Sequence, residues 1–268
     1  MASPIVLENE TTEETFDQSK AMFPYHLPRT RIVLDKLSPY SQDLIETFLL
    51  STEGSKILNI ITTLAPTYAQ DTEFRNVLAG GIFEGLSFTY LSLLNLYLSK
   101  NLANKNKYIL FSPTETVTLY HLKRPFNSVI SRFHLSLGIS HIVLPDGLLL
   151  QNSRRTWQII RIYEYTLGNK SDDREQRQFK RLSRKETFTS TLFLDDPERR
   201  VDLSQVRPGL DDKPLALHPN LELSYVVPIH SDLVLPGGRD IVPITRTEFR
   251  NFSESLILDC TTNPTRNF

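Results

Sequence analysis

The chain has 268 residues, of which 40% are hydrophobic and 23% are charged, and its formal net charge is −1. This composition is that of one large globular domain or of a domain with an appendage, and it excludes a uniformly basic nucleic-acid-binding protein. The single cysteine, Cys260, excludes an intrachain disulfide and suits a reducing compartment. The acidic N-terminus has no signal-peptide pattern, and we therefore expect a soluble, cytoplasmic protein.

The first part of the chain predicts a flexible start followed by helices. Residues 1–28 are acidic and have two prolines near their end, which predicts a flexible N-terminus. Residues 29–79 predict an N-terminal helical region, because apolar residues recur at helical spacing after Ser38 and again before Pro66. We expect Pro66 to stop the second of these helices, and the Gly80–Gly81 pair to break or kink the third.

Residues 80–268 predict an α/β core with a C-terminal extension. The helix expected over 82–99 is apolar on nearly all sides, so we expect it to be buried in the protein. Its apolar part is too short and too polar for a membrane span, and we expect no membrane partner. The other expected elements are strands at 108–111, 116–122, 187–194 and 221–230, helices at 127–137, from 171 onward and at 245–256, a hairpin over 146–164, and loops at 195–220 and 231–243.

Two acidic residues interrupt the apolar segments of the expected hairpin. Asp146 lies in the apolar run that begins the first strand, and Glu164 ends the aliphatic run of the second. Because side chains alternate along a strand, Ile160, Ile162 and Glu164 should share one face. A carboxylate among aliphatic side chains is costly to ionise unless it is paired, hydrogen-bonded or bound to a metal. The two acids therefore predict either a functional site or, alternatively, structural ion pairs with arginine.

The spacing of these acids resembles a known signature. Pro145 and Asp146, followed by 17 intervening residues and then by Glu164, Tyr165 and Thr166, resemble the PD-(D/E)XK motif of the restriction-endonuclease-like nucleases. The resemblance implies a mixed central β-sheet flanked by helices. It also implies that both acids and the backbone carbonyl of Tyr165 hold Mg²⁺ or Mn²⁺, which activates water for phosphodiester hydrolysis.

A third acid fits the same resemblance. The family commonly places a glutamate on its first core helix next to the metal, and Glu84 is the only charged residue between Asn76 and Ser99. The resemblance therefore makes Glu84 a third metal ligand. The alternative is a carboxylate that complements the dipole at the start of a helix.

One position departs from the family pattern. Thr166 stands where the family usually has lysine, and a neutral side chain cannot replace an ammonium that orients water and stabilises the phosphate. The lysine has either moved to a neighbouring element, as in some members, or the site is inactive. Lys180 is the candidate for the displaced lysine, and Lys170 is the second choice.

A basic stripe follows the hairpin. Its members, which recur at helical spacing after Ser171, are Arg174, Arg177, Lys180, Arg181 and Arg184. Beside a carboxylate site such a stripe predicts contacts with the phosphates of nucleic acid. The alternative is an ordinary solvated helix face.

These features predict a metal-dependent nuclease with Glu84, Asp146, Glu164 and Lys180 as catalytic residues. Whether its substrate is DNA or RNA stays open, and so does its oligomeric state, although the resemblance makes a homodimer one possibility because related nucleases often dimerise. One alternative is a catalytically inactive nuclease-fold module that binds nucleic acid or a protein. Another is a glycosidase with two carboxylates, which is less well supported because the chain has only one tryptophan for a sugar platform.

Overall fold

The computed structural model describes residues 33–68, 70–101, 108–123, 144–167, 181–187, 189–190, 201–231 and 238–262. The expected flexible N-terminus and the expected helix at 127–137 lie outside these residues. So do Lys170, Arg174, Arg177 and Lys180.

The described elements alternate between helices and strands. The helices are α3 (Pro39–Leu50), α4 (Thr52–Tyr68), α5 (Thr72–Asn101), α6 (Pro113–Lys123) and α9 (Arg246–Thr262), with a 3₁₀ turn, η1 (Leu203–Gln205). The strands are β1 (Tyr108–Phe111), β2 (Gly147–Asn152), β3 (Trp157–Tyr165), β4 (Leu215–Ile229) and β5 (Gly238–Thr245). Residues 181–187 and 189–190 are also helical, and together they are called the Lys185 segment below.

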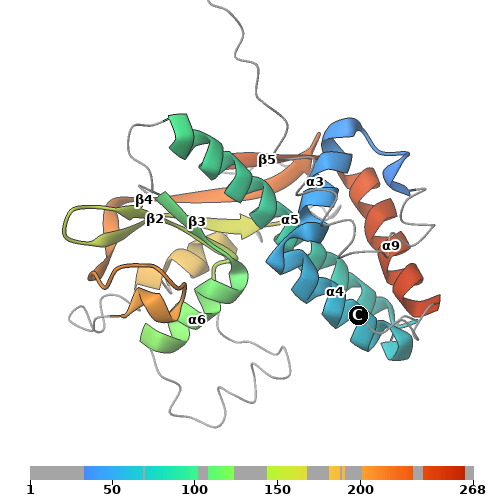
Figure 1. The fold of residues 1–268 in the computed structure, drawn as a ribbon, viewed down its shortest axis with the longest axis horizontal. Helices are drawn as coiled ribbons and strands as arrows, with labels where there is room; N and C mark the ends of the chain where they lie inside the picture. Colours follow the sequence, from blue (N-terminus) through green and yellow to red (C-terminus); the bar gives the residue numbers. More distant parts are fainter. Residues whose placement is uncertain are drawn as a thin grey trace, which may run out of the picture.

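The strands form one mixed sheet in the order β1-β2-β3-β4-β5. The pairs β1/β2 and β2/β3 are antiparallel, whereas β3/β4 and β4/β5 are parallel. Figure 1 shows the curled sheet beside the helices α3, α4, α5 and α9. The prediction of an α/β protein with a mixed central sheet flanked by helices is therefore confirmed.

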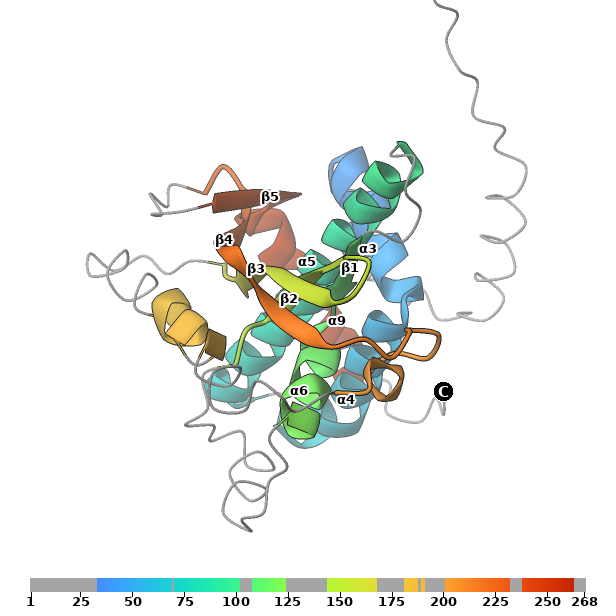
Figure 2. The ribbon, with the colours of Figure 1, turned by 90° about the vertical axis from the view of Figure 1, so that its left-hand side faces the viewer.

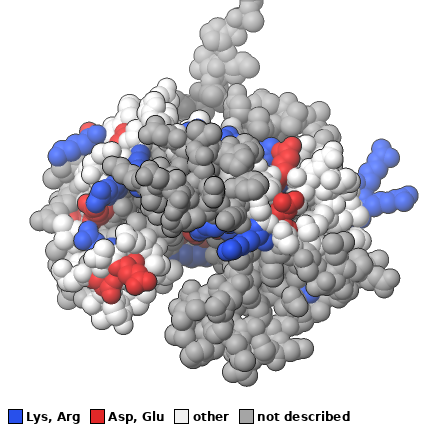
Figure 3. Space-filling view, turned by 180° about the vertical axis from the view of Figure 1, so that it is seen from behind, with Lys and Arg blue, Asp and Glu red and all other residues white. Residues whose placement is uncertain are grey.

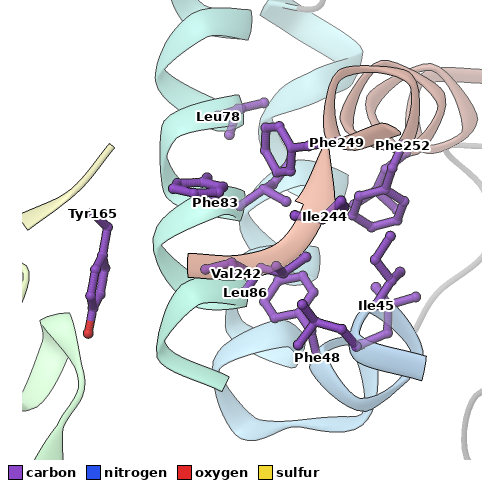
Figure 4. Packing of buried hydrophobic residues seen from close by; sticks show 14 of the residues in the cluster. Ile45, Phe48, Leu78, Phe83, Leu86, Tyr165, Val242, Ile244, Phe249 and Phe252 are labelled. Atoms are coloured by element: carbon purple, nitrogen blue, oxygen red, sulfur yellow. The ribbon is translucent and has the colours of Figure 1, made fainter. Parts of the chain in front are cut away.

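Each face of the sheet has its own hydrophobic core. The first core joins α3, α4, α5 and α9 to β4 and β5, and Figure 4 shows Phe48, Phe83, Phe249 and Phe252 gathered there. The second core lies on the opposite face, because Tyr225 and Val227 belong to it while Val226 belongs to the first. It contains residues of α6, of the Lys185 segment and of η1 (Figure 2).

The N-terminal helices pack directly onto the C-terminal helix. The Glu248 carboxylate accepts a hydrogen bond from the Ser38 N–H (3.0 Å) and another from Ser41 Oγ (3.2 Å), so it joins the starts of α3 and α9. Glu248 also caps its own helix, because it accepts from the Thr245 N–H at 2.8 Å. The predicted C-terminal helix is therefore confirmed, and it shares a core with the described part of the N-terminal helical region.

Two predicted helix breaks are wrong. Helix α4 continues through Pro66 to Tyr68, and α5 continues through Gly80 and Gly81. A glycine costs a helix about 1 kcal/mol relative to alanine. Burial of apolar side chains next to the pair, such as Ile82 and Phe83, outweighs that cost because packing supplies most helical stability in proteins.

The strand predicted at 116–122 is wrong, because these residues belong to α6. The preceding residues form a capping box in which Glu115 accepts from the Ser112 N–H (2.8 Å) and donates its own N–H to Ser112 Oγ (3.2 Å). Pro113 occupies the first helical position, where its missing N–H costs nothing. The start signal of this helix outweighs the β-branched residues that follow it.

Three other boundaries differ from the expectations. The described part of the segment 187–194 is helical rather than β. Strand β4 begins at Leu215, inside the expected loop, and β5 occupies residues 238–243 of the expected turn-rich segment 231–243. Strand pairing with β3 and β4 decides these last two elements, since β propensity depends strongly on the neighbouring strands.

Helix α5 is long and apolar enough to cross a membrane by length and composition over Thr72–Asn95, and 44% of its most apolar window is buried inside the protein. In the described structure this helix packs against α3, α4, α9 and β1. Its buried residues Ile82, Phe83 and Leu86 belong to the first core. The predicted role of this helix in the protein core is consistent with these contacts.

Candidate active site

Asp146 lies directly before β2 and is held between two strands. Its backbone N–H donates to the Tyr163 carbonyl (3.1 Å), and its Oδ2 accepts from the Tyr165 N–H (2.8 Å). The carboxylate is therefore attached to the end of β3, although it is 19 residues away from Tyr165 in the chain. The hydrogen bond from the Tyr165 N–H therefore places the Asp146 carboxylate beside Glu164, the residue before Tyr165 in the chain.

A β-bulge sets the direction of the Glu164 side chain. In the pairing of β3 with β2, Ile159 lies opposite Leu150 and Arg161 lies opposite Leu149, so Ile160 is the extra residue. Ile159 and Ile162 both point into the second core, and Glu164 follows Ile162 on the same face. The expectation that Ile160 shares this face is therefore wrong, whereas the expectation that Ile162 and Glu164 share one face is confirmed.

Both strand acids contact Lys185. The Lys185 Nζ lies 2.8 Å from Asp146 Oδ1 and also forms an ion pair with Glu164 Oε2. The side chain of Lys185 is 5% exposed and that of Glu164 is fully buried. Arg181, one helical turn earlier, places a guanidinium nitrogen 3.3 Å from Glu164 Oε1, with its side chain 60% exposed. Glu164 therefore has a buried cation on one oxygen and a solvent-facing cation on the other.

Glu84 lies within electrostatic reach of this cluster. Burial raises the pKa of the Glu84 carboxyl to about 8, and the charges of Asp146 and Glu164 contribute to the rise, while Lys185 and Arg181 oppose it. Burial and the charge of Asp146 likewise raise the pKa of Glu164. The charge of Asp146 thus acts on both glutamates and that of Glu164 acts on Glu84, so the three carboxyl groups lie within electrostatic range of one another.

The pKa of Lys185 is also raised, although burial acts on an ammonium in the opposite direction. Burial alone would lower the pKa of Lys185, but the carboxylates of Asp146 and Glu164 outweigh burial and raise it. The ammonium is therefore charged at neutral pH even though it is nearly inaccessible to solvent. Its charge compensates part of the negative charge of the three acids.

The structure thus places Lys185 between the two strand acids, and Glu84 lies within electrostatic range of all three. Lys180, the lysine expected in this role, lies outside the described residues. The sequence carries a signal for Lys185 that the basic stripe obscured. Leu182, Lys185 and Thr189 recur at helical spacing, and all three are buried, so they mark the inner face of the segment.

The remaining predicted site residues differ in where they lie relative to this cluster. Thr166 is buried, and its N–H donates to the Val226 carbonyl (3.0 Å), so the pairing of β3 with β4 extends to the position where the family has lysine. Of the predicted phosphate contacts, Arg181 is tied to Glu164, and Arg184 is exposed on the same segment. The metal contact predicted for the Tyr165 carbonyl stays a prediction.

Two buried hydroxyl groups hold the Lys185 segment in place. Thr189 Oγ1 donates to the Lys185 carbonyl (2.8 Å) and lies 2.5 Å from Tyr120 Oη of α6. Leu182 adds an apolar anchor in the second core. The position of the Lys185 ammonium is therefore set by α6 as well as by the two acids.

The donor set suits a hard divalent cation, but the side chains of the described residues do not form a ready cage. Among these residues, no three Asp, Glu, His or Cys side chains are arranged to hold a metal ion. Instead the Lys185 ammonium bridges Asp146 and Glu164. The oxygen donors of three mutually repelling carboxyl groups are nevertheless those that Mg²⁺ and Mn²⁺ prefer.

Gly147 is the residue that allows Asp146 to sit at this point. A Cβ at position 147 would lie 2.3 Å from Tyr165 Oη, and the Tyr165 ring is 5% exposed. We expect Gly147→Ala to lower the free energy of unfolding by about 2 kcal/mol, because the ring has little room to move. Thermal denaturation checks this.

Gly81→Ala in α5 is the matched control for Gly147→Ala. A Cβ at position 81 would meet nothing within 4 Å, and the change should stabilise the helix by up to about 1 kcal/mol. Equal effects of the two substitutions would contradict the packing argument.

No protein-family model, no curated protein and no solved structure matches this chain.

Proposed function

We propose that this protein is a metal-dependent nuclease that hydrolyses phosphodiester bonds of nucleic acid through a restriction-endonuclease-like core. One observation carries the proposal. The buried ammonium of Lys185 joins Asp146, which lies before β2, to Glu164 of β3, and Glu84 of α5 lies within electrostatic range of this cluster. The order helix, strand, strand is the one that the motif resemblance implies, and the ammonium supplies what Thr166 lacks.

Each side chain of the cluster has a separate role in this proposal. Glu84, Asp146 and Glu164 would hold Mg²⁺ or Mn²⁺, with the Tyr165 carbonyl as a further ligand. When bound, the ion supplies Lewis acidity and a water of lowered pKa. Lys185 orients the attacking water and stabilises negative charge on the phosphate, because its ammonium is fixed by Asp146 and cannot drift into solvent. Arg181 reaches the site from solvent and binds a phosphate of the substrate.

The sheet supports this assignment. The two strand acids lie at the start of β2 and at the end of β3, which are neighbours in a mixed sheet with helices on both faces. Helix α5 carries Glu84 and packs against β1 and β3. A mixed sheet with flanking helices is shared by many folds, so the chemistry of the cluster carries the proposal and the fold only agrees with it.

The test is cleavage of single- and double-stranded DNA and RNA with Mg²⁺ or Mn²⁺, comparing the wild type, the wild type with EDTA, and Asp146→Ala. We expect metal-dependent cleavage by the wild type alone. Asp146→Ala removes a metal ligand and one of the two contacts of the Lys185 ammonium. Equal rates in the wild type and the variant would rule out catalysis at this site.

The second candidate is an inactive nuclease-fold module that binds nucleic acid or a protein. The observation that favours it is the neutralisation of Glu164, since Lys185 and Arg181 occupy both of its oxygens. In an inactive module these ion pairs would permanently take the place of a bound metal ion. Titration with Mn²⁺ separates the two proposals. Mn²⁺ binding by the wild type that is lost in Asp146→Ala supports the nuclease, whereas the absence of Mn²⁺ binding by the wild type supports the inactive module.

A further inference from the structure

The turn between β2 and β3 presents two adjacent arginines, Arg154 and Arg155, at a rigid tip. Ser153 and Thr156 close the turn with several hydrogen bonds. The Ser153 N–H donates to the Thr156 carbonyl (2.9 Å), Ser153 Oγ donates to the same carbonyl (2.6 Å), and the Thr156 N–H donates to Ser153 Oγ (3.0 Å). Trp157, next in the chain, is buried and donates its N–H to the Pro214 carbonyl (2.9 Å). The two arginines are therefore carried by an anchored turn.

Among the residues that the structure describes, nothing compensates the charges of these arginines. Both side chains are exposed, and no ion pair or hydrogen bond joins either of them to another described residue. Lys213, which lies at the same end of the sheet, differs because it is bound to Asp211 (2.7 Å) and to Asn152 (2.8 Å). In the space-filling view, basic side chains project from the margin of the molecule where this hairpin lies (Figure 3).

The backbone of the turn does not dictate which residues occupy its tip. Two-residue hairpin turns favour asparagine and glycine, because the commonest types need positive φ at one or both positions. Neither Arg154 nor Arg155 has a positive φ. Two like charges side by side also repel each other. The backbone of this turn therefore does not require glycine or asparagine, and its geometry does not account for two adjacent arginines.

We propose that Arg154 and Arg155 bind the phosphate backbone of a nucleic-acid duplex, away from the site of cleavage. Because the turn is anchored, little backbone entropy is lost on binding, and the planar geometry of guanidinium groups matches phosphate oxygens. Nine residues separate Arg155 from Glu164 along the strand, which is about 30 Å at the usual rise per residue. That length corresponds to about nine base pairs of duplex. The inference rests on the proposed nuclease function, since it places the contact relative to the cleaved bond.

The test compares the double variant Arg154→Gln/Arg155→Gln with the wild type on duplexes of two lengths. Fluorescence anisotropy in EDTA measures binding of a 30-bp duplex and of a stem-loop with about six base pairs, in DNA and RNA, over a range of salt. We expect affinity for the long duplex to fall about tenfold and its salt slope to decrease by about 2, because two phosphate contacts are lost. Affinity for the short stem should change less than about twofold, since it cannot reach the turn. Cleavage of the long duplex should show a raised KM with an unchanged kcat.

The matched control is Lys36→Gln/Arg75→Gln. Both residues are exposed in the helical layer, without an ion-pair partner among the described residues, and the control removes the same net charge. We expect it to bind both substrates as the wild type does. If the hairpin variant behaves like this control, or loses affinity equally for both lengths, the proposed contact is wrong.

The same experiment separates this inference from the proposed function. Cleavage by the wild type with no length-dependent effect of the hairpin variant overturns the contact and leaves the nuclease proposal intact. Length-dependent binding through the two arginines without any cleavage supports the contact and overturns the nuclease proposal. A wild type that binds neither substrate overturns both.

Discussion

Replacing Lys185 by methionine is expected to lower the rate of metal-dependent cleavage about a thousandfold, the size of effect seen when one preorganised charge-stabilising group is removed. Methionine has a similar length and no charge, so it keeps the packing of the segment and removes only the ammonium. The variant should also be less stable by about 3 kcal/mol at pH 8, because Asp146 and Glu164 lose their shared cation in a buried place. The loss of stability should be smaller at pH 5, where the carboxyl groups of raised pKa take up protons.

Two further variants make this result specific. Lys185→Arg keeps the charge and should recover at least half of the lost stability, while cleavage stays low because a guanidinium does not fit the place of an ammonium. Lys180→Met removes the lysine that the basic stripe suggests, and we expect less than a threefold change in rate. Denaturation and single-turnover cleavage measure the two effects separately. A fully active Lys185→Met, or an inactive Lys180→Met, would show that the wrong lysine has been assigned.

Replacing Glu84 by glutamine is expected to stabilise the metal-free protein by about 2 kcal/mol at pH 8 and to weaken Mn²⁺ binding at least tenfold. The pKa of Glu84 is about 8 in the folded chain, well above its ordinary value of 4.5. The unfolded chain therefore loses this proton near pH 4.5 and the folded chain near pH 8. Between these values the folded state binds more protons, so the stability of the wild type falls as the pH rises. Glutamine has no titratable proton, so the variant lacks the fall in stability with rising pH that Glu84 causes.

Chemical denaturation between pH 4.5 and 9 measures this difference, and calorimetry in two buffers measures the protons released when Mn²⁺ binds. Wild type should release more protons than Glu84→Gln below pH 8, because the metal needs the ionised carboxylate. The control is Glu73→Gln, an exposed residue in the first turn of the same helix, which should leave both measurements unchanged. A parallel pH dependence of wild type and Glu84→Gln would place the Glu84 carboxyl outside the cluster.

The sequence predicted the parts of the fold that local patterns encode. The helix after Ser38, the strand at 108–111, the hairpin between Asp146 and Glu164, and the C-terminal helix all form where hydrophobic periodicity and capping residues indicate. The sequence was less reliable where packing competes with local preference. Helix α5 runs through Gly80 and Gly81 because its apolar side chains are buried on both sides of the pair.

Part of the site could also be found in the sequence. Glu84, Asp146 and Glu164 stand out because each is a charge inside an apolar run, and such a charge needs a partner. The identity of that partner could not be found in the same way. Lys185 is one of six basic residues between Arg174 and Lys185, and spacing alone does not show which face of a helix turns inward.

The sequence by itself therefore determined the acids and the strands that carry two of them, because alternation along a strand and the cost of a buried carboxylate are local properties. Only the tertiary structure decided which basic side chain contacts these acids. Tyr120 and Thr189 fix the Lys185 segment against α6, and the bulge at Ile160 turns Glu164 toward it. Contacts between residues so distant in the chain depend on how the layers pack, which no single segment of the sequence encodes.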